Sequence, residues 1–197
     1  EVKGNIFPIF DDILQKKDKE LLLQQHAKVI WMTGLSGSGK TTIAKGVERY
    51  LHSNGILNQL LDGDNIRVGI SNNLTFSIKD RSENIRRIAE VSKLFINCGV
   101  VTLNCFVSPT IKIRQIAKDV VGSENFIEVY INASVATCES RDVKGLYKKA
   151  RVGEIEDFTG ISAPFEAPIK PDLEVNTTDL SVDESVQKVL DYILPII

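Results

Sequence analysis

Residues 34–41 carry the spacing most closely tied to one chemistry, because they read Gly-Leu-Ser-Gly-Ser-Gly-Lys-Thr and match G-x-x-x-x-G-K-[ST]. The glycines let backbone N–H groups turn around a phosphate, and a helix starting there adds its positive dipole end. Lys40 then bridges the β- and γ-phosphates, and the Thr41 hydroxyl binds Mg²⁺. A fortuitous Gly-Ser turn is disfavoured, because an apolar run precedes the motif and a helical pattern follows it. The motif predicts an ATP site that uses Mg²⁺.

Two carboxylates, Asp62 and Asp64, follow the next apolar run in Leu-Asp-Gly-Asp-Asn. A carboxylate at the end of a neighbouring strand faces the phosphates, where it holds a metal-bound water or accepts a proton from an attacking hydroxyl. Asp64 is the first choice for the metal and the catalytic role, and Asp62 the second. The alternative is that both acids only form a turn around Gly63.

An acceptor site is indicated by an aromatic residue in a polar loop and by nearby cations. Phe76 lies in Asn-Asn-Leu-Thr-Phe-Ser, and four arginines are close to it in the chain: Arg67, Arg81, Arg86 and Arg87. Arginines give bidentate recognition of a second phosphate-like group. The alternatives left open are a Phe76 side chain in the core and arginines that are merely solvated.

Residues 142–171 break every periodicity, and five cations fall within residues 141–151. A structureless segment of this length inside a domain is commonly a mobile lid. Its cations would balance charge spreading over a transferring phosphoryl group. A solvated run of charges is the alternative interpretation.

The elements that must position these residues alternate between apolar runs and helical patterns, which is typical of a parallel sheet. Strands are expected at 29–32, 56–61, 100–107, 126–131 and 173–175. Helices are expected after residue 39 and at 79–97, 109–121, 134–139 and from 181 onward, with Ser134 and Ser181 as N-caps. The predicted fold is an α/β, P-loop NTPase-type three-layer αβα sandwich with a mainly parallel central sheet and a mobile lid. Residues 1–27 are expected to form a helical extension that packs on the main domain, residues 28–197.

The composition excludes several other classes. The chain has 197 residues, 43% hydrophobic and 25% charged, with a net charge of −2, so nothing favours nucleic acid or a membrane as partner. Cys98, Cys105 and Cys138 lack metal-site spacing and are typical of a reducing compartment. No apolar stretch is long enough to cross a bilayer, and we expect a cytoplasmic location.

The chain resembles adenylylsulfate kinases (APS kinases) from Trp31 to Leu194. The stretches that carry this resemblance are Gly34–Thr42, Leu61–Arg67, Asp80–Ile88, Phe106–Pro109, Arg141–Tyr147, and Phe158–Ile161 followed by Ala167-Pro168. The first stretch is shared by a superfamily, whereas the others are specific to the family. The resemblance implies Mg-ATP-dependent phosphorylation of the 3′-hydroxyl of adenosine 5′-phosphosulfate (APS), which gives PAPS and ADP in sulfate assimilation.

The resemblance also implies roles for individual residues. Phe76 and Phe158 would sandwich the acceptor adenine. The other implied acceptor contacts are Asp62, Asp64, Asn65, Arg67, Arg81, Asn84, Lys144 and the main chain at Val107. The implied ATP contacts are Gly34, Leu35, Ser36, Gly37, Ser38, Gly39, Lys40, Thr41, Thr42, Arg141 and Thr178. Some family members phosphorylate the serine that matches Ser108; here we interpret Ser108 as a helix cap. A homodimer is implied, and association with an ATP sulfurylase is left open.

Departures from the family's pattern lie on the acceptor side. They are Val68 and Ile70 in place of His and Leu, Thr75 in place of Gly, and Thr110 and Ile111 in place of Tyr and Arg. The loss of arginine at 111 removes a cation, for which Arg114 is expected to compensate in part. A kinase for another nucleotide-like 3′-hydroxyl or for a small metabolite is therefore the alternative. A nucleotide-switch protein and an inactive interaction module are disfavoured, because no Asn-Lys-x-Asp sequence occurs and Lys40, Thr41 and both acids are present.

Overall fold

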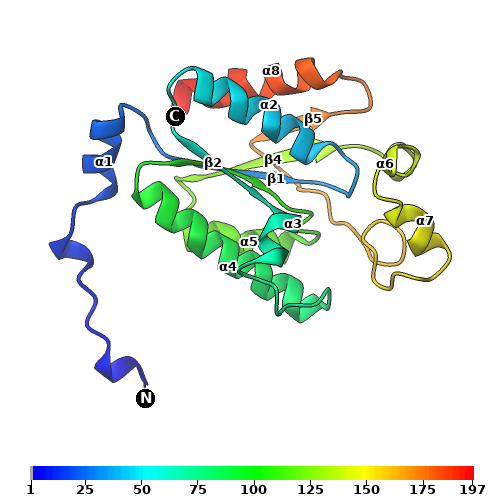
Figure 1. Ribbon diagram of the computed structural model, residues 1–197, viewed down its shortest axis with the longest axis horizontal. Coiled ribbons are helices and arrows are strands. Elements are labelled where there is room, and N and C mark those ends of the chain that lie inside the picture. The colour runs from blue at the N-terminus through cyan, green and yellow to red at the C-terminus, as the bar shows by residue number, and fades with distance from the viewer. Residues whose placement is uncertain (1) are drawn as a thin grey trace.

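The structure, a computed structural model, describes residues 2–197. Its centre is a five-stranded sheet in the order β2-β3-β1-β4-β5, and every pair of neighbours is parallel (Figure 1). The strands are β1 (Val29–Thr33), β2 (Asn58–Asp62), β3 (Val101–Cys105), β4 (Phe126–Asn132) and β5 (Leu173–Asn176). Because all five run the same way, their carboxyl ends meet at one edge of the sheet, where such folds bind ligands.

Helices cover both faces of this sheet. Helices α2 (Lys40–Ser53) and α8 (Val182–Ile193) lie on one face, and α4 (Ile78–Asn97) and α5 (Ile111–Val121) on the other (Figure 1). The shorter helices are α1 (Lys16–Leu23), α3 (Gly63–Val68), α6 (Val135–Arg141) and α7 (Leu146–Arg151), with 3₁₀ turns at Val2–Asn5, Phe10–Asp12 and Leu194–Ile196. The predicted three-layer αβα sandwich with a parallel sheet is confirmed.

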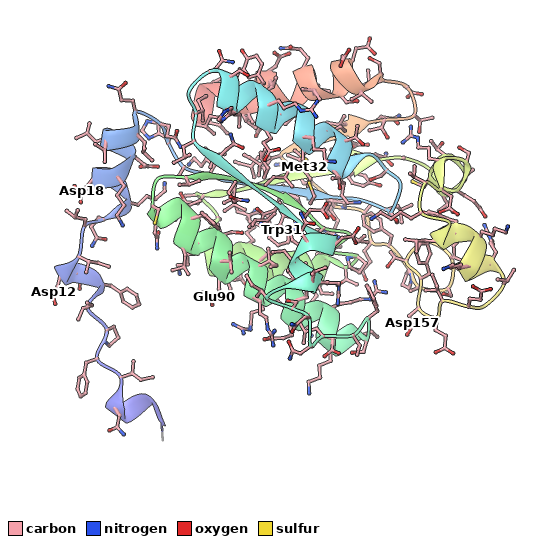
Figure 2. The ribbon with its side chains drawn as sticks, in the orientation of Figure 1. Asp12, Asp18, Trp31, Met32, Glu90 and Asp157 are labelled. Atoms are coloured by element: carbon pink, nitrogen blue, oxygen red, sulfur yellow. The ribbon has the colours of Figure 1, made fainter. Side chains whose placement is uncertain are left out.

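The central strand β1 is buried on both of its faces, as its uninterrupted apolar sequence requires. Ile30 and Met32 pack toward α2 and α8, and Trp31 packs toward α4 and α5 (Figure 2). The Trp31 ring stacks between Phe106 and Phe126, with centroid distances of 5.5 and 5.6 Å. This two-sided core fixes the strand that leads into residues 34–41.

The N-terminal extension differs from its prediction. Helix α1 exists, but Leu21 and Leu22 are each 81% exposed, so they do not pack as expected. The body is contacted instead at the end of α1, where Gln25 Nε2 donates to the carbonyls of Gly99 (2.7 Å) and Leu57 (2.9 Å). The helix stops because Gln24 adopts a left-handed conformation, which turns Gln25 inward. Residues 4–14 extend away from the body (Figure 1).

Two of the three expected helix caps are confirmed, and the third is wrong. Ser134 caps α6, and Ser181 forms a capping box on α8. Helix α5, however, begins at Ile111 with Thr110 as its cap. Ser108 cannot cap it, because its backbone is left-handed (φ 38°) and its hydroxyl points into the core.

The segment 142–171 is less irregular than its sequence suggests. It contains α7, which starts where Gly145 adopts a left-handed conformation, and a turn over 157–163 in which the Phe158 carbonyl accepts from three backbone N–H groups. Tyr147, Ala150 and Thr159 are buried. We call residues 142–171 the lid. Among the described helices, none has the length and apolar content needed to cross a bilayer.

Candidate active site

The loop between β1 and α2 is shaped by close approaches that only glycine permits. A Cβ at Gly37 would lie 2.9 Å from the Cys138 carbonyl oxygen, and a Cβ at Gly34 would collide with that of Ile131. Gly39 occupies the N-cap position of α2 and offers no side chain. The loop therefore packs on β4 and α6, and its N–H groups and the start of α2 remain to bind an anion.

Lys40 is buried within this loop. Its Nζ donates to the carbonyl oxygens of Gly34 (2.9 Å) and Leu35 (2.7 Å). Burial lowers the pKa of Lys40 to about 8, against 10.5 for a free side chain. A nearby anion would raise this pKa again, since it favours the charged form. Lys40 is thus placed to meet phosphate oxygens without being strongly hydrated.

The carboxylate beside Thr41 is that of Asp62. Thr41 Oγ1 donates to Asp62 Oδ2 at 2.8 Å, and Asp62 Oδ1 accepts from the backbone N–H of Asp64 at 3.0 Å. The first choice for this place, Asp64, is exposed and forms an ion pair with Lys144 of the lid. This placement has a local cause: β2 ends at Asp62, and Gly63 starts α3, which carries Asp64 away from Thr41 toward the lid.

These residues fit a magnesium ion in a nucleotide site. The described part of the chain holds no group of three or more His, Cys, Asp and Glu side chains that would form an all-protein metal cage. Mg²⁺ in kinases needs none, because it keeps several waters and takes phosphate oxygens with one or two protein ligands. The Thr41 hydroxyl and the Asp62 carboxylate supply hard oxygen donors side by side.

Arg141 and Thr177 are bonded to each other beside the phosphate loop. The Arg141 guanidinium donates to the carbonyl and the hydroxyl oxygen of Thr177, at 2.6 and 3.1 Å. The Thr177 hydroxyl in turn donates to the Ser38 carbonyl at 2.8 Å. Thr178 follows this contact and is exposed, and Thr42 is exposed in the first turn of α2. Arg141, Thr178 and the phosphate loop are therefore brought together as predicted.

Phe76 is 62% exposed, so the alternative that it belongs to the core is wrong. Arg67 covers its ring, with the guanidinium carbon 4.2 Å from the centroid. Arg67 also donates to the carbonyls of Leu74 and Thr75, at 3.2 and 3.1 Å. The loop that presents Phe76 is held in place by an arginine that the sequence places in the acceptor site.

Arg81 connects the Phe76 loop to the lid. Its Nε donates to the Phe76 carbonyl at 2.7 Å, and its terminal nitrogens donate to the Asp157 carbonyl (2.8 Å) and the Thr159 hydroxyl (3.0 Å). Figure 2 shows Asp157 where the lid comes close to the start of α4. Phe158 lies between those two lid contacts in the chain, so one guanidinium holds the two segments that carry Phe76 and Phe158.

The remaining predicted acceptor residues fall into distinct places. Asn84 is buried one helical turn after Arg81, and its Oδ1 has no hydrogen-bond partner among the described residues. Asn65 is exposed on α3, and the Val107 carbonyl accepts from the Thr33 hydroxyl at 2.8 Å. Arg86 and Arg87 both pair with Glu83, which holds the Glu83 pKa down to about 2. Arg86 supports only α4, whereas Arg87 also donates to the Ile70 carbonyl and to Asn73 Oδ1, each at 2.8 Å, and so helps to hold the loop that leads to Phe76.

Ser108 and Arg114 are structural. Ser108 is buried; its Oγ accepts from the Trp31 indole at 3.1 Å and donates to Thr33 Oγ1 at 2.9 Å. Arg114 is also buried, and donates to the Glu128 carboxylate and to the carbonyls of Ser108 and Glu166, at 2.8, 2.9 and 2.8 Å. The expectation that Arg114 replaces the missing cation at position 111 is therefore wrong, because all three of its nitrogens are engaged away from the cleft.

Sequence reasoning missed the role of one lid residue. Tyr147 is 1% exposed, its hydroxyl donates to the Ser36 carbonyl at 2.8 Å, and its ring meets Phe158 edge-on with centroids 5.0 Å apart. The sequence did carry a signal. Tyr147 and Ala150 lie at the i, i+3 spacing of a helix, and Tyr147 ends the stretch Arg141–Tyr147, which carries part of the family resemblance.

Known proteins resemble the chain over nearly its whole length. A family model described as adenylylsulphate kinase matches residues 26–176. The adenylyl-sulfate kinase of Bacteroides fragilis strain YCH46 is 58% identical over 195 residues, 99% of this chain and 96% of that relative. The adenylyl-sulfate kinase of Staphylococcus carnosus strain TM300 is 47% identical and covers 98% and 96%. The structure of the Mycobacterium tuberculosis APS kinase CysC in complex with AMPPNP and APS superposes with a TM-score of 0.83, at 44% identity, over 86% of this chain and 99% of that one.

Proposed function

The chain belongs to the adenylylsulfate kinase family and is an ATP-dependent kinase that converts APS and ATP to PAPS and ADP, and we propose how its residues divide this reaction. One half of the site, residues 34–41 with Arg141 and Thr178, holds ATP. The other half holds APS between Phe76 and Phe158. The observation that carries this division is the Arg81 bridge, which ties the loop of Phe76 to the lid turn that carries Phe158.

On the donor side, the loop N–H groups of Gly34 to Gly39 and the start of α2 bind the phosphates. Lys40 lies along the same loop and neutralises charge on the β- and γ-phosphates. Thr41 and Asp62 are the residues that would hold Mg²⁺, Asp62 directly or through water, because their oxygens are in contact. When bound, Mg²⁺ would supply further neutralisation of the phosphate charge.

On the acceptor side, the rings of Phe76 and Phe158 orient the APS adenine. Arg67, Arg81 and Asn84 hold its ribose and phosphosulfate. Asn84 supports this assignment, because a buried amide oxygen without a partner is favourable only when a ligand or water donates to it. Asn65 and the Val107 main chain lie at the same edge of the sheet. Arg67 and Arg81 each use part of their donor set within the protein, which leaves further N–H groups for the acceptor.

The transfer itself is direct and in line. Asp64 orients the 3′-hydroxyl or accepts its proton, and Lys144, its ion-pair partner in the lid, balances charge on the transferring group. A phosphoserine relay at Ser108 is not part of the proposal, because that hydroxyl is buried and bonded to Trp31 and Thr33. Lid closure would exclude water from the phosphoryl group.

The same proposal includes a homodimer and a cytoplasmic location. The second is supported by three free thiols, Cys98, Cys105 and Cys138, of which Cys105 and Cys138 are buried. Association with an ATP sulfurylase would involve the exposed residues 4–14. Neither the dimer nor the association bears on the chemistry above.

The test is a coupled ADP-release assay with APS, AMP and other nucleotide conjugates at micromolar concentration. We expect APS to be the preferred acceptor, even with Thr75, Thr110 and Ile111 in the acceptor region. Preference for AMP or another conjugate would reject APS as the substrate and favour a kinase for a different nucleotide-like 3′-hydroxyl.

A further inference from the structure

Tyr147 contacts both halves of the site, although its side chain is buried from solvent. It lies in α7 of the lid, and its hydroxyl donates to the Ser36 carbonyl in the middle of the phosphate loop at 2.8 Å. Its ring packs edge-on against Phe158, the lid wall of the acceptor site, at 5.0 Å between centroids. One rigid side chain thus spans the distance between the donor loop and an acceptor wall.

The surroundings of Tyr147 make this connection stiff. Leu35 of the loop, Cys138 of α6 and Tyr147 form a small core of their own, against which Phe158 packs. Leu35 also lies close to Gly160, where an added Cβ would be only 3.0 Å from Leu35 Cδ2. Packed interiors transmit displacements because they have little free volume. A displacement of the phosphate loop therefore also displaces the lid turn that carries Phe158.

We propose that Tyr147 is a positioning residue that couples the two substrate sites, so that nucleotide in the phosphate loop strengthens binding of the acceptor between Phe76 and Phe158. This inference rests on the proposed function. When the loop N–H groups face a phosphate, the intervening carbonyls face away from it, and the Tyr147 hydroxyl stabilises one of them in that orientation. Acceptor stacked on Phe158 holds the Tyr147 ring in place, and the effect is reciprocal.

The hydroxyl is suited to this role because it stays a donor. Burial raises the pKa of Tyr147 above its ordinary value, so the phenol remains protonated over the working pH range. The hydrogen bond to Ser36 therefore does not depend on pH near neutrality.

The test compares APS affinity with and without nucleotide in three proteins. Dissociation constants for APS are measured calorimetrically for the full chain, for Tyr147→Phe and for Tyr130→Phe, each alone and with saturating AMPPNP. Tyr147→Phe keeps the ring and removes only the hydroxyl. Tyr130→Phe is the matched control, since it removes a hydroxyl that bonds to Asn132 and not to the phosphate loop.

We expect AMPPNP to tighten APS binding in the full chain. The tightening factor, which is the ratio of the APS dissociation constants without and with AMPPNP, should fall by about fivefold in Tyr147→Phe, because that is the effect of one ordinary hydrogen bond. The control should keep the original factor. The fall should also appear when AMPPNP affinity is measured with and without APS, which a purely structural role would not produce. A second variant, Phe158→Leu, keeps the hydroxyl bond but removes the ring contact, and should lower the same ratio.

The outcomes separate the two proposals. An unchanged factor in Tyr147→Phe, or a factor of one in the full chain, overturns the inference while APS binding still supports the proposed function. Failure of the full chain to bind APS under either condition rejects the proposed function instead. Should Tyr147→Phe not fold, Phe158→Leu decides: an unchanged ratio overturns the coupling.

Discussion

At the scale of single residues, Lys40 combines burial with a functional charge. Its ammonium group rests on two carbonyls of the loop that it serves, and burial holds its pKa at about 8. Arriving phosphates favour the charged form, so the pKa of Lys40 rises when nucleotide binds. Above about pH 8, binding must then take up a proton.

This gives a prediction for the pH dependence of ADP affinity. From pH 7 to pH 9.5, ADP binding should weaken progressively once the pH passes about 8, by up to tenfold per pH unit, because the free protein has lost the Lys40 charge. Calorimetry in buffers of different ionisation enthalpy would measure the proton uptake. Lys40→Met should bind ADP more weakly at every pH and show none of this uptake. Weaker ADP binding at high pH without proton uptake in the full chain would contradict the lowered pKa of Lys40.

The pH dependence of the free energy of unfolding should also report the ionisation of Lys40. Since the Lys40 pKa is lowered from 10.5 to about 8, the unfolded chain binds the proton more tightly, and stability of the nucleotide-free protein should rise between those two pH values. Urea unfolding of the full chain and of Lys40→Met across this window isolates the contribution. A smaller rise in Lys40→Met is the expected result, and parallel curves would argue against a lowered pKa.

Substitutions of the two carboxylates after β2, Asp62 and Asp64, should differ in how they change the Mg²⁺ requirement of turnover. Asp62→Asn weakens the metal side, so the Mg²⁺ concentration for half-maximal turnover should rise, with a loss in turnover of about a hundredfold. Asp64→Asn should lower turnover to a similar extent while leaving the Mg²⁺ requirement nearly unchanged, because Asp64 faces Lys144. Steady-state rates over a Mg²⁺ titration measure both. The reverse pattern would restore Asp64 as the metal-side residue.

Residue roles followed from the sequence where the geometry is local. The phosphate loop is specified by its own spacing, so Lys40 and Thr41 were assigned correctly to one loop. The order of Asp62 and Asp64 depends on where β2 ends, a matter of one or two residues that no pattern resolves. Arg114 was misjudged because its partners, Glu128 and Glu166, come from distant parts of the chain.

At the scale of elements, the docking of α1 rests on a glycine. Gly99 has a left-handed backbone (φ 79°), and an added Cβ would lie 3.0 Å from Leu23 Cδ1 and 3.2 Å from the Lys19 carbonyl carbon. Gly55 has nearly the same φ of 77°, but an added Cβ would meet nothing within 4 Å. The pair therefore separates backbone strain from contact with α1.

We expect Gly99→Ala to lower the free energy of unfolding by about 2 kcal/mol and Gly55→Ala by about 1 kcal/mol, the cost of the left-handed conformation alone. Urea denaturation monitored by circular dichroism gives both values. Equal losses would show that α1 does not press on Gly99.

Elements with a long periodic pattern were predicted well, whereas two of the short helices, α3 and α7, were missed. Helix α4 begins and ends within one residue of its expected bounds, because its apolar spacing runs over 20 residues. Helices α3 and α7 have six residues each; α3 begins at Gly63 and α7 follows Gly145, and these glycines by themselves indicate turns. Their stability comes from packing, as buried Ile66 and Tyr147 show, and packing is not visible in a local window.

At the scale of the whole molecule, Arg114 joins three regions that are remote in sequence: β4, the loop after β3 and the end of the lid. Glu166 completes the junction, since its carboxylate accepts from the Ile111 N–H at 2.7 Å and its own N–H donates to the Pro109 carbonyl at 2.8 Å. The lid is thereby anchored on the start of α5, next to the Val107 main chain.

Arg114→Met should therefore be strongly destabilising, by about 3 kcal/mol, because it strands Glu128 and two carbonyls in a buried place. Arg151→Met removes a bidentate contact with Glu139, but one whose side chains are 55% and 35% exposed, so it should cost less than about 1 kcal/mol. Chemical denaturation measures the difference. Similar losses for the two variants would mean that burial is not what makes the Arg114 junction strong.

The order of the strands has a consequence for a chain that leaves the ribosome from its N-terminus. Strand β1 is made before both of its neighbours, which pair with it from Thr102 and from Phe126. Its fully apolar Val-Ile-Trp-Met sequence therefore has no strand partner until first β3 and then β4 have been made. A nascent chain arrested before β4 should be digested quickly by added protease, whereas one released after α8 should resist. The central position that makes β1 the most protected strand of the finished enzyme makes it the most vulnerable one during synthesis.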